Sequence, residues 1–298
     1  MAEEINIYLC EPRSFCFGVT KAIDMVNEAI KKYGPPVYIL NEIVHNRHVV
    51  EELKSKGAVF ITSMSDADKS RPLIFSAHGV SKAIENEAKS QIQIIIDATC
   101  PLVKKVHKKV KELDEKGCNI IIIGKENHPE IIGTKGQIFS GSKALVVSSK
   151  EDIEKLKITG KTAYVTQTTL SVDETKDIAA ALKLKFPDIY TMNESDICFA
   201  TTQRQAAVKN AVKKASLIIV IGSKNSSNST KLKEISLSNG AEEAMLIDSA
   251  GEIDWKILDS HTNIGITAGA SAPEHLVQEI IEALRKRYEK INIQSVNI

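Results

Sequence analysis

The sequence lacks the features that define several common classes of protein. Aromatic residues make up only 5% of its 298 residues and the formal net charge is +1, so it has few platforms for base stacking and no excess of basic charge. No apolar run approaches membrane-spanning length, and no signal-like segment precedes Glu3. The five cysteines include no CxxC pair, which argues against a disulfide framework. We therefore expect a cytoplasmic protein with neither a membrane nor a nucleic-acid partner.

Three of the cysteines stand at equivalent places in a repeated pattern. A continuous apolar run, residues 94–96, leads to Cys100, which opens a basic helix. Cys16 and Cys198 likewise follow short predicted strands and open helices. Strands and helices alternate along the chain, which predicts right-handed parallel α/β units. Repetition of this kind is typical of one supersecondary unit copied several times.

We therefore predict an α/β fold of three similar small parallel-sheet domains, arranged as a pseudo-threefold trefoil around a central cleft. The expected domains are residues 11–98, 99–196 and 197–287. A strand within residues 1–10 is a candidate to join the third domain, and residues 288–298 form a C-terminal tail. In such a trefoil the loops at the ends of the strands would face the cleft, where open α/β proteins bind ligands.

The three repeated cysteines suit a metal centre if they meet at one point. Helix N-termini favour thiolates, as would the lysines that follow Cys100, which are Lys104, Lys105, Lys108 and Lys109. A structural zinc ion takes four ligands, whereas an iron–sulfur cluster held by three cysteines keeps one iron open. Buried structural thiols explain the spacing equally well, because such long intervals are not specific. Cys10 and Cys118 lie in predicted strands and are interpreted as structural.

Polar residues recur in the other loops that follow strands. His45, His128 and Ser226 lie 28 or 29 residues after a cysteine (45 minus 16, 128 minus 100, 226 minus 198). Imidazoles, hydroxyls, an amide and helix N-termini together suit a phosphate group, and no Walker loop is present. The candidates are His45, His78, His128, Thr168, Ser226, Ser227, Asn228 and Ser271. Each alone is more simply a turn or capping residue, as Ser271 with Glu274 would be, but their equivalent placement favours a ligand site.

Glu130 is the carboxylate in these loops that is best placed for acid–base chemistry. Beside an open iron it could protonate a leaving hydroxyl, an effect worth roughly 100-fold to 10,000-fold in rate. The alternative is an acidic residue in the first turn of a helix, where it complements the helix dipole. Thr168 belongs to a run of threonines that could relay protons or could simply end a strand.

These residues lie in motifs that resemble those of the 4-hydroxy-3-methylbut-2-enyl diphosphate reductases, the last enzymes of the non-mevalonate pathway of isoprene biosynthesis. The similarity spans nearly the whole chain. The matching motifs are Cys16-Phe17-Gly18-Val19, His45-Asn46-Arg47, Ser76-Ala77-His78-Gly79-Val80, Asp97-Ala98-Thr99-Cys100-Pro101, His128-Pro129-Glu130, Val165-Thr166-Gln167-Thr168-Thr169-Leu170-Ser171, Ser223-Lys224-Asn225-Ser226-Ser227-Asn228-Ser229 and Thr267-Ala268-Gly269-Ala270-Ser271-Ala272-Pro273.

The resemblance implies an iron–sulfur oxidoreductase that reductively dehydroxylates (E)-4-hydroxy-3-methylbut-2-enyl diphosphate to isopentenyl diphosphate and dimethylallyl diphosphate. It implies an oxygen-sensitive [4Fe-4S] cluster with one open iron site, held by Cys16, Cys100 and Cys198. It assigns the substrate hydroxyl and its protonation to Glu130 and Thr168. It assigns diphosphate binding to His45, His78, His128, Ser226, Ser227, Asn228 and Ser271. It also implies an electron donor of the ferredoxin or flavodoxin type, and we expect a monomer.

One departure from that family's pattern lies just before His128. Lys125 and Asn127 stand where members of the family often have His and Gly, which leaves the binding residues intact but could change how the loop closes. Two other functions use the same residues. A zinc-dependent phosphate-ester hydrolase would employ the histidines, and a non-catalytic diphosphate-binding module would need no cluster.

Overall fold

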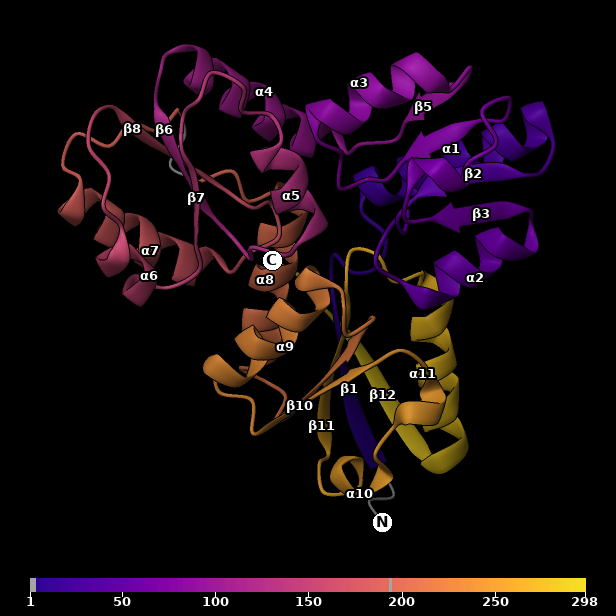
Figure 1. The fold of residues 1–298 in the computed structure, drawn as a ribbon. Helices are drawn as coiled ribbons and strands as arrows, with labels where there is room; N and C mark the ends of the chain where they lie inside the picture. The colour runs from indigo at the N-terminus through magenta and orange to yellow at the C-terminus, as the bar shows by residue number, and fades with distance from the viewer. Residues whose placement is uncertain (1–3, 193–194) are drawn as a thin grey trace. The chain divides into compact units, whose positions relative to one another are not determined.

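The computed structural model describes residues 4–192 and 195–298 and contains three small parallel β-sheets with flanking helices (Figure 1). Close contacts divide the chain into two compact units. Unit 1 comprises the described residues through Phe17, together with His45–Val49 and Phe199–Ile298. Unit 2 comprises Gly18–Val44 and Val50–Cys198. The α/β class with three small parallel sheets, predicted from the sequence, is confirmed.

Unit 1 contains a five-stranded sheet in which long apolar strands are covered on both faces. The strand order is β10 (Glu243–Ile247), β9 (Leu217–Ile221), β11 (Asn263–Ala268), β1 (Glu4–Cys10) and β12 (Lys290–Val296). Ile219 packs in a cluster with α11 (Glu274–Arg287), whereas Ile218 packs with α8 (Phe199–Ala211) and α9 (Ser227–Ser238). Because successive side chains of a strand point to opposite faces, the unbroken apolar run of β9 requires a helix layer on each side. Figure 1 shows α8 and α9 on one side of this sheet and α11 on the other.

Unit 2 contains two smaller sheets. The first has the order β3 (Ala58–Ile61), β2 (Val37–Leu40), β4 (Leu73–Phe75) and β5 (Ile95–Asp97), and the second has the order β7 (Ala144–Val147), β6 (Asn119–Ile123) and β8 (Thr162–Thr166). The helices that accompany them are α1 (Phe17–Tyr33) and α2 (Arg47–Ser55), whose first residues belong to unit 1, and α3 (Lys82–Gln91), α4 (Pro101–Glu115), α5 (Pro129–Lys135), α6 (Lys150–Lys155) and α7 (Val172–Lys185). Every pair of neighbouring strands in both sheets is parallel. The carboxyl ends of the strands in each sheet therefore share one edge, and the loops that follow them are neighbours.

The sequence at 288–298 contains a strand, although its pattern predicts only a tail. Strand β12 pairs with β1 in parallel along seven residue pairs, from Glu4–Lys290 to Cys10–Val296. Val296 is its one fully buried residue, so β12 lacks the apolar alternation that would identify it. In the described part of the chain, no helix is long and apolar enough to cross a bilayer.

The burial of Val296 predicts how much this edge strand contributes to stability. Val296 is 4% exposed and packs with Cys10 and Ile218. Val296→Asp should lower the free energy of unfolding by about 3 kcal/mol, because it removes apolar burial and places a carboxylate in an apolar cluster. The control Ile298→Asp lies two residues on at a site that is 60% exposed, and should change it by less than about 0.5 kcal/mol. Urea unfolding measures both, and equal effects would show that β12 does not pack as described.

Candidate functional site

The three repeated cysteines occupy the predicted positions at the starts of helices. Cys16, Cys100 and Cys198 immediately precede α1, α4 and α8. None of the three forms a disulfide bond and all three are partly exposed, whereas Cys10 and Cys118 are buried. A sulfur at a helix N-terminus lies near the backbone N–H groups of the first turn, which have no partner within the helix. The exposed cysteines are therefore the ones whose surroundings suit a metal ligand.

Each of these cysteines is also joined to a loop that carries a predicted binding residue. In all three cases the backbone N–H of the cysteine donates to a carbonyl within that loop. The bonds join Cys16 to Ala270 at 3.1 Å, Cys100 to Ala77 at 3.0 Å and Cys198 to Thr168 at 3.0 Å. Ala270 and Ala77 directly precede Ser271 and His78, so the sequence repeat corresponds to one repeated backbone contact.

The meeting of the three sulfurs remains a prediction. Cys16 lies in unit 1, and Cys100 and Cys198 lie in unit 2. Among residues 4–192 and 195–298, no group of three or more His, Cys, Asp or Glu side chains is close enough to hold one metal ion. Three of the four lysines expected to favour a thiolate at Cys100 instead form ion pairs with carboxylates. The pairs are Lys104–Asp97 at 2.6 Å, Lys108–Glu112 at 3.8 Å and Lys109–Asp196 at 3.1 Å.

In unit 1 the start of α9 brings together three of the predicted diphosphate residues. Ser226 is the N-cap of the helix, and Ser227 and Asn228 lie in its first turn. All three are at most 7% exposed. A Cβ atom at Gly269 would lie 2.0 Å from the Ser229 hydroxyl oxygen, so only glycine allows the loop after β11 to approach the helix so closely. The backbone N–H groups of this helix start form a site suited to an anion.

Asn228 has a buried side-chain donor that makes no hydrogen bond within the described residues. Its Oδ1 accepts a hydrogen bond from the backbone N–H of Ala270 at 2.9 Å. Its Nδ2 is buried and has no hydrogen-bond partner within the described residues. Leaving a buried amide N–H group unpaired costs free energy, so the site is more stable when an acceptor binds there. A phosphate oxygen is such an acceptor, and the arrangement fits the predicted role of Asn228.

The capping interpretation of Ser271 is wrong. The N-cap of α11 is Pro273, with no side-chain capping bond, and Glu274 binds Arg13 and Ser14 instead. The Ser271 hydroxyl donates to the backbone carbonyl of His45 at 3.0 Å and lies 3.5 Å from the hydroxyl oxygen of Ser226. Within unit 1 the structure therefore brings together His45, Ser226 and Ser271, which come from three different loops.

Unit 2 brings His78 and His128 together. Their rings are in edge-to-face contact with centroids 5.7 Å apart. His128 is the N-cap of α5, and its Nδ1 accepts a hydrogen bond from the backbone N–H of Glu130 at 3.1 Å. A ring nitrogen that accepts a hydrogen bond cannot carry a proton, so a neutral His128 carries its proton on Nε2. That N–H group is then a donor for an anionic ligand.

The Glu130 carboxyl is buried between α5 and the loop that follows β8. It is 2% exposed and accepts two hydrogen bonds from Thr168, from the backbone N–H at 2.7 Å and from the hydroxyl at 2.9 Å. Burial raises the pKa of Glu130 from 4.5 to about 7, against the lowering effect of the Thr168 bonds, and the charge of Asp196 raises it further. Although Glu130 lies in the first turn of α5, its carboxyl is thus held by Thr168. A carboxyl with a pKa near neutrality is suited to proton transfer.

Sequence reasoning missed two kinds of supporting residue. Gln167 is buried between two strand-end loops, where its Oε1 accepts from the backbone N–H of Lys125 at 3.1 Å and its Nε2 donates to the Thr169 hydroxyl at 3.1 Å. Lys109 and Asp196 form an ion pair in which each side chain is 5% exposed. The signal for Lys109 was its place on the buried face of α4, beside Val106 and Val110, where a solvated lysine is not expected.

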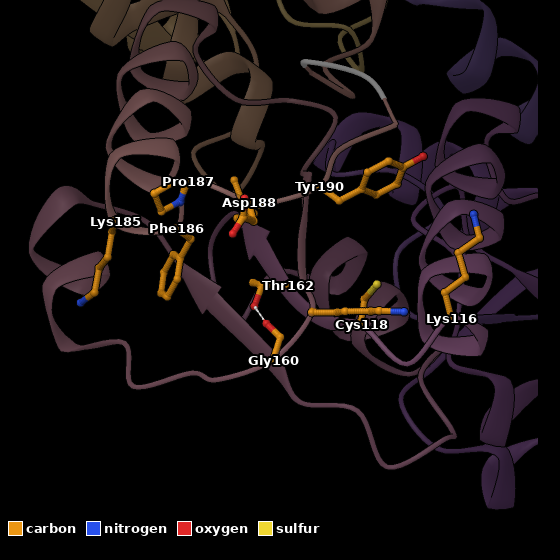
Figure 2. A pocket seen from close by; sticks show the side chains of 11 residues that line it. Lys116, Cys118, Gly160, Thr162, Lys185, Phe186, Pro187, Asp188 and Tyr190 are labelled. Atoms are coloured by element: carbon orange, nitrogen blue, oxygen red, sulfur yellow. Dashed lines mark hydrogen bonds between the residues drawn. The ribbon is translucent and has the colours of Figure 1, made fainter.

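A separate cavity lies at the other edge of the β7–β6–β8 sheet (Figure 2). It has a volume of about 740 Å³ and is lined by residues at the starts of β6 and β8 and after the end of α7. Figure 2 shows Lys116 and Cys118 across this cavity from Phe186 and Pro187. None of the predicted site residues lines it, whereas Glu130 and Thr168 follow the carboxyl ends of β6 and β8. The cavity is therefore distinct from the candidate site.

Comparisons with known proteins match the chain over nearly its full length. The family model described as LytB protein matches residues 7–285. The 4-hydroxy-3-methylbut-2-enyl diphosphate reductase of Hyphomonas neptunium is 49% identical over 98% of this chain and 93% of its own, and that of Ruegeria sp. is 48% identical over 96% and 90%. A solved structure of the E-1-hydroxy-2-methyl-but-2-enyl-4-diphosphate reductase from Plasmodium falciparum has a TM-score of 0.93 and 40% identity, over 98% of this chain and 92% of that chain.

The raised pKa of Glu130 predicts that its contribution to stability depends on pH. The folded protein holds a proton on Glu130 up to about pH 7, whereas the unfolded chain releases it near pH 4.5. Stability is therefore lost as the pH rises between these values, by about 2 to 3 kcal/mol from pH 5 to pH 8. Glu130→Gln cannot ionise and should not show this loss.

Urea unfolding of the apoprotein at both pH values measures the difference between the wild type and this variant. Glu126→Gln is the matched control, because Glu126 lies four residues earlier in the same loop and its side chain is 55% exposed. If the free energy of unfolding depends on pH in the same way in the wild type and in Glu130→Gln, the raised pKa of Glu130 is contradicted.

Proposed function

The chain belongs to the LytB family, and we propose that it catalyses the reductive dehydroxylation of (E)-4-hydroxy-3-methylbut-2-enyl diphosphate to isopentenyl diphosphate and dimethylallyl diphosphate. The reaction consumes two electrons and two protons. One proton leaves with the hydroxyl group as water, and the other is added to carbon. Within the chain, the observation that carries this proposal is the buried hydrogen-bonded pair of Glu130 and Thr168. The Thr168 carbonyl also accepts from the backbone N–H of Cys198, a predicted cluster ligand. The chain is at the same time similar to 4-hydroxy-3-methylbut-2-enyl diphosphate reductases.

The diphosphate would be held by neutral donors more than by cations. In unit 1, the N–H groups at the start of α9 and the Asn228 amide can donate to phosphate oxygens, and the Ser271 hydroxyl would do so in place of its bond to the His45 carbonyl. In unit 2, His78 and the Nε2–H group of His128 provide further donors. Hydrogen bonds to charged oxygens are stronger than neutral ones, and several together would fix the orientation of the substrate chain.

A [4Fe-4S] cluster held by Cys16, Cys100 and Cys198 would supply the electrons and one open coordination position. The chemistry of the donors fits this group, because all three are thiols outside disulfide bonds, partly exposed and placed at helix starts. We propose a ferredoxin or flavodoxin as the electron donor, a monomeric protein and a cytoplasmic location.

Glu130 would provide the proton that leaves with the hydroxyl group. Its pKa of about 7 means that the carboxyl is protonated in slightly acidic solution. Thr168 holds both carboxyl oxygens, so the proton is presented from a fixed position. Burial also excludes the bulk water that would otherwise compete for it. Activity that depends on this acid should decline as the pH rises above about 7.

The substitution Glu130→Gln tests this role. It preserves the volume and can still accept the backbone hydrogen bond of Thr168, but it has no proton of suitable acidity to give. We expect turnover to fall by about 100-fold to 10,000-fold, while the affinity for inorganic diphosphate stays within about twofold. Glu126→Gln is the control and should keep full turnover. Full turnover in Glu130→Gln would exclude the proposed proton transfer.

Anaerobic purification tests the reaction itself. We expect a coloured protein that contains iron and sulfide, loses both in air and converts the hydroxylated diphosphate when supplied with electrons. Cys100→Ser should remove the cluster and the reductase activity. A colourless, air-stable protein that hydrolyses phosphate esters would instead identify a zinc hydrolase. A protein without a cluster whose diphosphate affinity survives Cys100→Ser would be a non-catalytic binding module.

A further inference from the structure

Two buried cations link the helices that follow candidate cysteine ligands to the segments that precede other cysteines. Lys109 lies on α4, which begins after Cys100, and Arg204 lies on α8, which begins after Cys198. The two residues are 5% and 3% exposed, although lysine and arginine are rarely buried unless they are paired. Neither belongs to the proposed binding or proton-transfer residues. Their burial therefore needs an explanation of its own.

Lys109 contacts the segment that carries Cys198. Its Nζ atom is 3.1 Å from both carboxylate oxygens of Asp196, two residues before that cysteine. Asp196 is in turn fixed to the end of β8, because its carboxylate accepts from the backbone N–H of Thr166 at 3.0 Å and its own N–H donates to the Thr166 hydroxyl at 2.8 Å. One ion pair thus joins α4, the end of β8 and the segment before Cys198.

Arg204 contacts the segment that carries Cys16. Its guanidinium donates to the backbone carbonyls of Ala200 at 2.8 Å, Arg13 at 3.3 Å and Ser14. Ser14 has a φ of 57°, in the left-handed region that a residue other than glycine occupies only when its surroundings hold it. Arg204 and Glu274, which accepts from the Ser14 hydroxyl at 2.6 Å, supply those surroundings two residues before Cys16.

Stability alone does not explain these contacts. An apolar side chain of similar size at a buried site is often at least as stabilising as an ion pair. A buried cation differs in that it requires acceptors at fixed distances and directions, so it specifies one position for the backbone that provides them. The ion pair Lys108–Glu112 on the same helix is exposed, spans 3.8 Å within α4 and fixes no other segment.

We propose that Lys109 and Arg204 are positioning residues for the cysteine ligands, with Lys109 fixing the segment of Cys198 and Arg204 fixing the segment of Cys16. The assignment of these cysteines as ligands rests on the proposed function. The claim that each cation fixes its segment does not rest on the proposed function, and it can be measured in the protein without a cluster. The two cations act on different cysteines, so their effects are separable.

The rate of alkylation of each cysteine by iodoacetamide tests the proposal in the reduced, full-length apoprotein, with mass spectrometry identifying the site. Lys109→Met should raise the rate at Cys198 by about tenfold and leave Cys16 unchanged. Arg204→Met should raise the rate at Cys16 by about tenfold and leave Cys100 unchanged. Lys109→Arg keeps the charge and should restore most of the protection at Cys198. Lys108→Met removes the exposed pair of the same helix and should change no cysteine.

A merely structural role predicts a different pattern. If Lys109 and Arg204 only stabilise the fold, each Met variant will raise the rates of all five cysteines together, including the buried Cys10 and Cys118. Such a uniform rise, or rates equal to those of Lys108→Met, would overturn the proposal.

Hydrogen exchange of the wild-type protein provides a second test that does not depend on how any variant folds. The backbone N–H groups of Thr166 and Cys198 should exchange with solvent at the same rate as those of α4, because the ion pair opens when that helix opens. Exchange of the Cys198 N–H at the rate of an unprotected loop would contradict the positioning role.

Cluster retention separates this proposal from the proposed function. In reconstituted protein, a chelator should remove iron about tenfold faster from the two Met variants than from Lys108→Met. A selective change in thiol reactivity in a protein that never binds a cluster would uphold the positioning role and reject the reductase. The opposite result is an active reductase in which the two Met variants change neither the alkylation rates of the cysteines nor the rate of iron loss. That result would uphold the reductase function and reject the positioning role.

Discussion

The buried ion pair between Lys109 and Asp196 is the contact on which the proposed site in unit 2 depends. It crosses from the helix that Cys100 opens to the segment that ends at Cys198. Through Thr166 it reaches the end of β8, and two residues further on Thr168 holds the Glu130 carboxyl. The same Asp196 charge adds to the rise in the pKa of Glu130. The Asp196 carboxylate therefore influences both the position of the segment before Cys198 and the pKa of Glu130.

The repeated backbone bond from cysteine to neighbouring loop explains why three loops of different sequence can serve one purpose. In each case the residue before the helix donates its N–H to a strand-end loop, which places a cysteine beside a loop that carries a predicted site residue. Parallel sheets make this possible because their strand ends share one edge. The side chains in these loops can then differ, with a histidine in one, a threonine in another and a serine in the third.

The sequence predicts the regular parts of the fold well and the long-range contacts poorly. The isoleucine runs of β6 and β9 identify strands buried on both faces, and the cysteines mark three helix starts. Strand β12 escapes prediction because its pairing with β1 needs backbone atoms more than apolar side chains. The Lys109–Asp196 pair joins residues 87 positions apart, and no local pattern connects them. Whether the three sulfurs meet is equally a question of long-range geometry, and it stays a prediction.

The unusual residues before His128, Lys125 and Asn127, are compatible with the proposed site. The side chains of Lys125 and Asn127 are exposed, and the loop is held through its backbone. The Lys125 N–H donates to Gln167, and the Lys125 carbonyl accepts from the N–H of His128 at 2.9 Å. A change of side chain at these two positions therefore leaves the bonds that place His128 and Glu130 intact. The buried side chain of Gln167 is the group that holds this loop, because its Oε1 is the acceptor for the Lys125 N–H.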